Sequence, residues 1–313
     1  MKQRVVIALG GNALQKKGEV TAEAQKSVAK KVGELIAKLS EKYDIIVAHG
    51  NGPQVGNILI HEEQAATDSA PAMPLETAVA MSQGEIGYWL SQSISNAFTK
   101  LGKKRKVATI VTQAVVDKSD PAFRKPTKPI GQFYTEKEAK TLAKAKDWVV
   151  KEDAGRGWRR VVASPKPIDI VEKKAITAMV EDGIIVIAAG GGGIPVYRTK
   201  ILGRLKGVDA VIDKDFAAEK LAELVNADIF VSVTAVPNAY VNYGTPTKIA
   251  LKKVNLALMD GFLKSGEFKA GSMLPKVEAA MAFAKKRKIG IITDVEHLKD
   301  ALAGKAGTII TSS

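Results

Sequence analysis

Three short apolar segments of this chain each run directly into a cluster of glycines. They read VVIALGGNAL, IIVAHGNGPQVG and IIVIAAGGGGIPV, with the glycines near residues 10, 50 and 190. Glycine lets backbone N–H groups approach an anion because no Cβ stands in the way, and a helix that starts after such a loop adds the positive end of its dipole. The three junctions predict strands whose carboxyl ends converge on one anion-binding crevice.

The chain between these junctions alternates between two patterns. Apolar runs rich in β-branched residues predict buried strands at Val5–Leu9, Ile45–Ala48, Val107–Val116, Ile184–Ala189, Ile229–Val233 and Ile289–Ile292. Helical patterns predict helices at 22–40, from about 54, at 83–101 and at 277–284. Fully apolar strands that alternate with helices favour an α/β fold with a mostly parallel sheet covered on both faces.

Composition excludes several classes of site. The 313 residues include no cysteine, which rules out disulfides, iron–sulfur clusters and cysteine nucleophiles. The three histidines lie far apart in the sequence and lack the spacing of metal ligands. The apolar stretch near the N-terminus, Val5 to Leu9, is too short for a signal peptide, and no run reaches the roughly 20 residues of a membrane span. We therefore expect a cytoplasmic protein with no membrane partner.

The net charge of +14 predicts an anionic partner. Aromatic residues make up only 5% of the chain, which does not favour the aromatic-rich surface of a nucleic-acid-binding protein. Residues 118–168, here called the lid segment, are rich in Pro, Gly, Lys and Arg and too long for an ordinary connection. Its two tryptophans favour a small ordered subdomain, although a solvated charged loop is the alternative.

Two lysines stand in unusual surroundings. Lys214 follows an apolar stretch and is flanked by Asp213 and Asp215, and Lys276 follows GSMLP at the start of an expected helix. An aspartate between two lysines can hold both side chains extended through charge-assisted hydrogen bonds. We assign this role to Asp215, and Asp213 is a weaker candidate for the same role or for a contact with Mg²⁺.

The glycine loops match none of the common nucleotide-binding signatures. The P-loop G-x-x-x-x-G-K-[ST], the dinucleotide motif G-x-G-x-x-G and the protein-kinase motifs H-R-D and D-F-G are all missing from the sequence. A phosphotransferase with this sequence therefore belongs to another class.

The motifs together resemble the carbamate kinase family, a branch of the amino-acid kinase superfamily. The matching segments run in order from about residue 5 to residue 285. They are ALGGNAL, AHGNGPQVGN, PAMPLETAVAMSQGEIGYWL, PTKPIG, KEDAGRGWRRVV, SPKPIDI, AAGGGGIPV, GVDAVIDKDFAAEKLAEL and GSMLPKVEAA. DAGRGWRRVV and GSMLPK separate this family from the acetylglutamate, aspartate and uridylate kinases.

The resemblance implies an open α/β/α sandwich, a homodimer and reversible Mg²⁺-dependent phosphoryl transfer between ATP and carbamate, giving ADP and carbamoyl phosphate. In such enzymes the direction that yields ATP serves arginine fermentation. It also implies an acceptor lobe at residues 1–193, which includes the lid segment, and a nucleotide-binding lobe at 194–313.

The resemblance assigns roles to matching residues. The catalytic set is Lys128, Lys214, Asp215 and Lys276. Lys128 would reach down from the lid segment to the acceptor, and the other two lysines would hold the ATP phosphates. The loops would bind substrate and phosphate through Gly10, Gly11, Asn12, Gly50, Asn51, Gly52, Gly191 and Gly192. The nucleotide side would include Asp213, Thr234, Tyr243 and Met273.

Two other interpretations stay open. A kinase of the same superfamily could act on an amino-acid carboxylate or a nucleoside monophosphate, and this would need a longer acceptor pocket. A nucleic-acid-binding module would explain the positive charge, but it would leave the three glycine loops without a purpose.

Overall fold

The computed structural model describes residues 2–11, 14, 19, 21–153, 155–286 and 288–312. Within them, an eight-stranded sheet has the order β15-β17-β16-β12-β1-β2-β9-β3. In that order, the strands are Lys253–Asn255, Thr308–Thr311, Ile289–Thr293, Ile229–Val233, Gln3–Leu9, Tyr43–His49, Ile185–Ile187 and Val107–Thr109. Strands β16, β12, β1, β2, β9 and β3 pair in parallel, and the direction reverses only between β16 and β17. The predicted mostly parallel sheet is confirmed.

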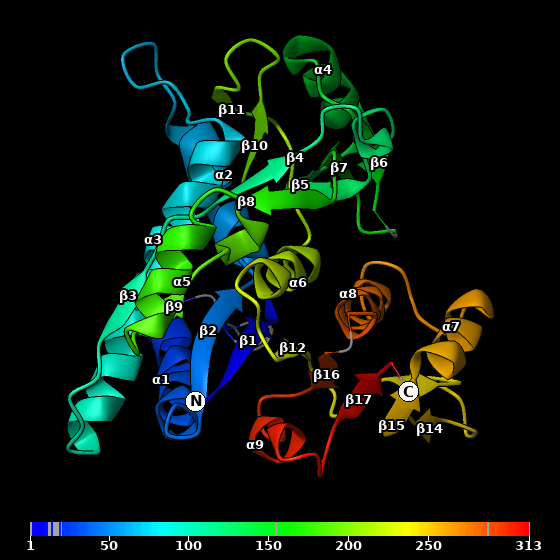
Figure 1. Cartoon of the computed structure of the whole chain (residues 1–313). Helices are drawn as coiled ribbons and strands as arrows, with labels where there is room; N and C mark the ends of the chain where they lie inside the picture. The colour runs from blue at the N-terminus through cyan, green and yellow to red at the C-terminus, as the bar shows by residue number, and fades with distance from the viewer. Residues whose placement is uncertain are drawn as a thin grey trace.

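Helices cover both faces of this sheet (Figure 1). They are α1 Ala22–Leu39, α2 Gly52–Ala65, α3 Leu75–Lys100, α4 Glu136–Lys146, α5 Lys173–Glu181, α6 Lys214–Leu224, α7 Leu256–Lys264, α8 Leu274–Ala284 and α9 Leu298–Leu302. Alternate residues of β1 face opposite sides, since Val6 packs in the core with α6 and α8, whereas Val5 and Ile7 pack with α1 and α3. The predicted three-layer α/β/α sandwich is therefore correct. No helix in the described ranges is long and apolar enough to cross a membrane.

Three smaller sheets accompany the main one in the described part of the chain. The four-stranded sheet consists of β11 Leu205–Gly207, β10 Ile194–Arg198, β4 Gln113–Val116 and β8 Pro167–Ile170. The three-stranded sheet of the lid segment consists of β5 Lys128–Tyr134, β7 Trp158–Val162 and β6 Val150–Glu152, and a hairpin joins β13 Tyr240–Val241 to β14 Ile249–Ala250. In Figure 1 the lid segment lies at the top, on the side of the molecule toward which β2 points.

The lid segment packs against the N-terminal half of the chain. Ile130 of β5 and Val162 of β7 share an apolar cluster with Val55 and Leu59 of α2 and with the start of α3. Both lid residues are at least nine-tenths buried. The contact holds the lid sheet over α2 and so fixes the position of Lys128, the first residue of β5.

Two predicted elements have different bounds in the structure. The single strand expected at Val107–Val116 is wrong, because the chain leaves the main sheet after Thr109 and joins the four-stranded sheet at Gln113. Thr112 holds the break, since its hydroxyl donates to the carbonyl of Ile110 and its N–H donates to Gln83. The helix expected from residue 83 begins at Leu75, directly after Pro74.

Packing of α1 on α3 predicts opposite effects for two glycine substitutions. A Cβ on Gly33 would lie 2.8 Å from the backbone carbon of Ser93, so Gly33→Ala should push the helices apart and destabilise the fold by about 1–3 kcal/mol. Gly84 on the exposed side of α3 has open space, so Gly84→Ala should stabilise the helix by up to about 1 kcal/mol. Urea unfolding of both variants tests this, and equal effects would contradict the packing.

Candidate active site

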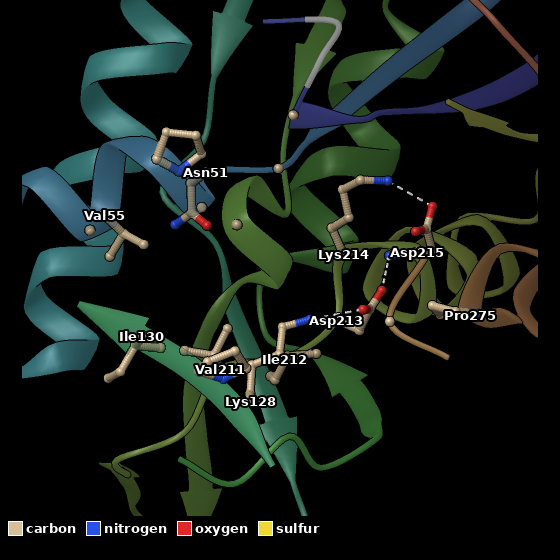
Figure 2. Close-up of a pocket in the computed structure, with 18 of the residues that line it drawn as sticks. Asn51, Val55, Lys128, Ile130, Val211, Ile212, Asp213, Lys214, Asp215 and Pro275 are labelled. Atoms are coloured by element: carbon tan, nitrogen blue, oxygen red, sulfur yellow. Dashed lines mark hydrogen bonds and ion pairs between the residues drawn. The ribbon is translucent and has the colours of Figure 1, made fainter. Parts of the chain in front are cut away.

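A cavity of about 550 Å³ lies where the carboxyl ends of β1 and β2 meet the lid segment and the starts of α6 and α8. Figure 2 shows residues from the loop after β2, the lid segment and the starts of α6 and α8 around it. Those predicted from the sequence that line it are Gly11, Gly50, Asn51, Gly52, Lys128, Gly191, Asp213, Lys214, Asp215 and Lys276. Segments more than 250 residues apart in the chain, such as Gly11 and Lys276, therefore share one space.

Asp215 joins the two lysines that stand far apart in the sequence. Its Oδ1 accepts a hydrogen bond from Lys214 Nζ at 2.7 Å, and its Oδ2 accepts one from Lys276 Nζ at 3.0 Å. Ser232, at the end of β12, donates to the same Oδ1 at 2.6 Å. The Asp215 residue is 1% exposed. The carboxylate therefore fixes two ammonium groups at the edge of the cavity, and the Ser232 hydroxyl in turn holds the carboxylate.

The charges of Asp215 and the two lysines bound to it do not balance. Burial by itself would raise the pKa of Asp215, but the ammonium groups of Lys214 and Lys276 hold that pKa well below its usual range. Burial lowers the pKa of Lys214, and attraction by Asp215 opposes this effect. One carboxylate faces two cations, which leaves an excess of positive charge beside the cavity. Such a site favours an anion with several oxygens, such as a phosphate chain.

Asp213 links the lid segment to α6. Its Oδ1 accepts the N–H of Asp215 at 3.0 Å and so caps the helix, while its Oδ2 pairs with Lys128 Nζ at 3.1 Å. Figure 2 shows Lys128 reaching from β5 toward Asp213. The lid lysine thus lies beside the same helix start that carries Lys214.

The glycine loops leave room for close contacts. A Cβ on Gly191, whose φ is +64°, would lie 2.2 Å from Asn51 Nδ2, so only glycine allows the amide of Asn51 to lie against this backbone. A Cβ on Gly50 would lie 3.2 Å from Lys214 Cδ. Gln83 of α3 fixes the third loop by donating to the carbonyls of Thr112 and Gly190. The loops of β2 and β9 are therefore packed together around Asn51.

Comparison with known proteins decides the family. A model of the amino acid kinase family matches residues 3–293. Carbamate kinase from Pyrococcus horikoshii is 52% identical and the alignment covers 99% of this chain and 100% of the relative, and the enzyme from Latilactobacillus sakei is 48% identical with 99% of each chain covered. The structure of carbamate kinase from Giardia lamblia bound to AMP-PNP superposes with a TM-score of 0.94 at 44% identity, covering 99% of this chain and 98% of that one.

This chain belongs to the carbamate kinases, within the amino acid kinase family. The resemblance drawn from the motifs is confirmed, and so is the assignment of the chain as a kinase, that is, a phosphotransferase. UMP kinase from Ureaplasma parvum shares only the fold, with a TM-score of 0.52 at 15% identity.

Some residues predicted for the site do not line the cavity. A Cβ on Gly10 would lie 2.8 Å from the carbonyl oxygen of Val233, and one on Gly192 would lie 2.2 Å from that of Ile212, so both glycines allow close packing of the backbone. Thr234, Tyr243 and Met273 lie outside the cavity-lining set: the Thr234 N–H donates to Thr293, Tyr243 is exposed, and Met273 packs at the start of α8. Asn12 lies outside the described residues.

Several other residues of the cavity carry little signal in the sequence. Val55 of α2 and Ile130 of β5 form an apolar wall, and Arg159 of β7 also lines the cavity. The Arg159 guanidinium donates to the carbonyl of Gly131 and pairs with Asp153, while its Nε has no partner among the described residues. The sequence shows only that this segment is rich in Lys and Arg, since nothing local indicates which arginine faces inward.

His49 is buried behind the loops and does not line the cavity. Its Nδ1 donates to the carbonyl of Gly50 at 3.0 Å, because a carbonyl can only accept. A Cβ on Gly190 would lie 2.5 Å from its Nε2, so the ring fills the space between two of the glycine loops. Burial lowers the pKa of His49 to about 4. The imidazole is therefore neutral at pH 7 and acts as a packing and hydrogen-bonding group.

The lowered pKa of His49 predicts that acid destabilises the fold. The unfolded chain takes up a proton at His49 near pH 6.5 and the folded chain only near pH 4, so acidification between these values favours unfolding. The loss of unfolding free energy from this one group should reach about 3 kcal/mol at pH 4. His49→Gln should remove that part of the pH dependence. Urea unfolding of both proteins from pH 7 to pH 4 provides the comparison, and parallel pH curves would refute the assignment.

Proposed function

We propose that this protein catalyses the reversible transfer of a phosphoryl group between ATP and carbamate, which gives ADP and carbamoyl phosphate. The observation that supports this most is the pair of ammonium groups held by Asp215 at the edge of a cavity lined by glycine loops. The similarity to carbamate kinases over 98% or more of the chain supports the choice of substrates. The AMP-PNP in the Giardia lamblia relative supports a nucleotide as phosphoryl donor.

The chemistry needs cations more than it needs a base. Carbamate is already an anionic nucleophile, so no proton has to be removed before it attacks a phosphoryl group. Phosphoryl transfer spreads negative charge over the equatorial oxygens, and positioning with cationic clamps carries most of the catalysis. Two anions must also be brought together, and we assign Lys128, Lys214 and Lys276 to offset their repulsion. The neutral, buried His49 is consistent with a reaction that uses no histidine base.

We divide the cavity into two sides. Gly50, Asn51, Gly52 and Lys128 would bind the acceptor, and Gly11 and Gly191 would contact the transferred phosphoryl group. Lys214 and Lys276 would hold the nucleotide phosphates, with Asp215 orienting them and Asp213 positioning the helix. Thr234, Tyr243 and Met273 would lie along the path to the base. The corresponding halves of the chain are residues 1–193 and 194–313, and β1 and β12 meet at the centre of the shared sheet.

Mg²⁺ would neutralise phosphate charge when bound and help to align the reacting groups. Asp213 and Asp215 already accept hydrogen bonds from lysines and from the start of α6. The described residues hold no group of three or more His, Asp and Glu side chains suited to a metal ion. We therefore propose that Mg²⁺ enters with the phosphates of ATP or ADP.

The wider setting follows from the family likeness. We propose a cytoplasmic homodimer that makes ATP from carbamoyl phosphate during arginine fermentation. Size-exclusion chromatography with light scattering tests the dimer. An assay with carbamoyl phosphate and Mg-ADP, run beside an acetylglutamate control with Mg-ATP, tests the reaction and the alternative acceptor.

Lys214 and Lys276, here called the clamp lysines, should each be needed for most of the turnover. Lys214→Ala and Lys276→Ala should each lower the rate of ATP formation from carbamoyl phosphate and ADP by about a hundredfold or more, because each lysine stabilises phosphoryl charge in a buried site. Lys264→Ala, on the exposed side of α7, is the matched control and should leave the rate unchanged. Wild-type turnover in both clamp variants, measured by coupled ATP detection, would exclude the proposed roles.

The lid lysine should act on the acceptor more than on the nucleotide. Lys128→Ala should raise KM for carbamoyl phosphate roughly tenfold or more, since a cation beside the acceptor is lost. Its Kd for ADP, measured by calorimetry, should stay close to the wild-type value. Lys125→Ala, an exposed lysine of the same segment, serves as control. Equal losses of acceptor and ADP affinity would contradict the division of the cavity.

A further inference from the structure

Ser82 of α3 is a polar residue in an apolar environment. It is 0% exposed. The buried face of this helix is otherwise formed mainly by apolar side chains, among them Leu75, Ala78, Val79, Ile86, Leu90, Ile94 and Phe98. Burial of a hydroxyl group costs free energy unless its hydrogen bonds are made. The hydrogen-bond partners of Ser82 therefore indicate its role.

The Ser82 hydroxyl determines which way the Asn51 side chain faces. Ser82 Oγ lies 2.7 Å from the carbonyl of Val79, and because a carbonyl only accepts, the single hydroxyl proton points there. The Ser82 oxygen can then only accept, and Asn51 Nδ2 donates to it at 2.8 Å. The reverse orientation of the amide would place two acceptor oxygens against each other. Ser82 thus fixes the amide nitrogen of Asn51 toward α3 and its oxygen away from α3.

The oxygen of this amide is free to meet a ligand. Asn51 lines the cavity and is 6% exposed, and no described residue donates a hydrogen bond to its Oδ1. Gly191 backs the amide on one side, which leaves it little room to turn. In Figure 2 the Asn51 amide points into the space between α2 and Lys214, with its oxygen on the side of Lys214. The Asp213 and Asp215 oxygens that line the same cavity already accept hydrogen bonds, whereas the Asn51 oxygen is left for a ligand that carries a hydrogen-bond donor.

Carbamate and carbamoyl phosphate carry such a donor. Their –NH₂ group is an N–H donor, whereas the methyl group in the same position of acetate and acetyl phosphate is not. We propose that Ser82 is a positioning residue for acceptor specificity: it holds Asn51 Oδ1 toward the cavity, where this oxygen accepts a hydrogen bond from the amino group of the carbamoyl substrate. This inference rests on the proposed function and adds to it the group that distinguishes the substrate from its methyl analogue. A site built to bind a substrate N–H discriminates strongly against an analogue that lacks it.

The test compares two acyl phosphates in Ser82→Ala. Wild-type protein, Ser82→Ala and Ser91→Ala are assayed for ATP formation from Mg-ADP with carbamoyl phosphate and with acetyl phosphate, and acetyl phosphate is also measured as a competitive inhibitor of carbamoyl phosphate. Ser91 is a matched control because its hydroxyl makes the same bond to the carbonyl three residues earlier on α3, but on the exposed side. ADP binding by calorimetry reports the integrity of the nucleotide side.

Loss of the Ser82 hydroxyl leaves the Asn51 amide without a fixed orientation. We expect kcat/KM for carbamoyl phosphate to fall roughly tenfold or more, while the inhibition constant of acetyl phosphate and the Kd of ADP stay near the wild-type values. Ser91→Ala should match the wild type. A purely structural role would change the handling of both acyl phosphates in proportion, so an unchanged ratio between them overturns the inference.

Two other results are possible: Ser82→Ala does not fold, or the wild-type protein is inactive. If Ser82→Ala does not fold, Ser82→Cys keeps the shape of the side chain with a larger terminal atom but supplies a poor acceptor, and the same loss of discrimination is expected from it. If the wild-type protein does not convert carbamoyl phosphate and ADP at all, the proposed function itself fails. A wild-type protein that is active and a variant whose ratio is unchanged would leave the proposed function standing and reject only the role of Ser82.

Discussion

The contact of Asp215 with two lysines is the interaction on which the rest of the site depends. Two ammonium groups held near each other in a buried place repel, and without the carboxylate between them neither would stay there. Lys214 is the first residue of α6 and Lys276 lies in the first turn of α8, so the ion pairs also require these helices to start side by side. Small buried residues such as Ala217, Ala218 and Ala280 let α6 and α8 pack closely.

The neighbouring aspartate connects this centre to the lid segment. Asp213 caps α6 and pairs with Lys128, so one side chain fixes both the helix start and the lid lysine. The apolar contact of Ile130 with α2 holds the other side of the lid in place. Cations that belong to three separate segments of the chain thereby reach one cavity. A phosphoryl group bound there would be surrounded by charge that the fold has already positioned, which lowers the reorganisation needed during the reaction.

Local sequence signals explain which parts of this arrangement were predictable. Strands β1, β2 and β12 were expected almost at their observed bounds because short runs of apolar, β-branched residues are strong local signals. Asp215 could be proposed because it adjoins Lys214 in the sequence. The apolar wall of Val55 and Ile130 could not, since it arises only when the lid docks on α2. The break at residues 110–112 was missed for the same reason: a side chain of α3 holds it open.

Buried polar residues of α3 and β2 restrict the conformation of the glycine loops. Glycine allows the close approach of backbone to ligand, but it also gives the chain more freedom to lose on folding. Gln83 binds the carbonyls of Thr112 and Gly190, and the ring of His49 fills the space between the loops of β2 and β9. The Gln83 amide uses its hydrogen bonds inside the protein, and neither Gln83 nor His49 lines the cavity. Their burial therefore favours one loop geometry, and a substrate bound there would already be in place for the cations at the cavity edge.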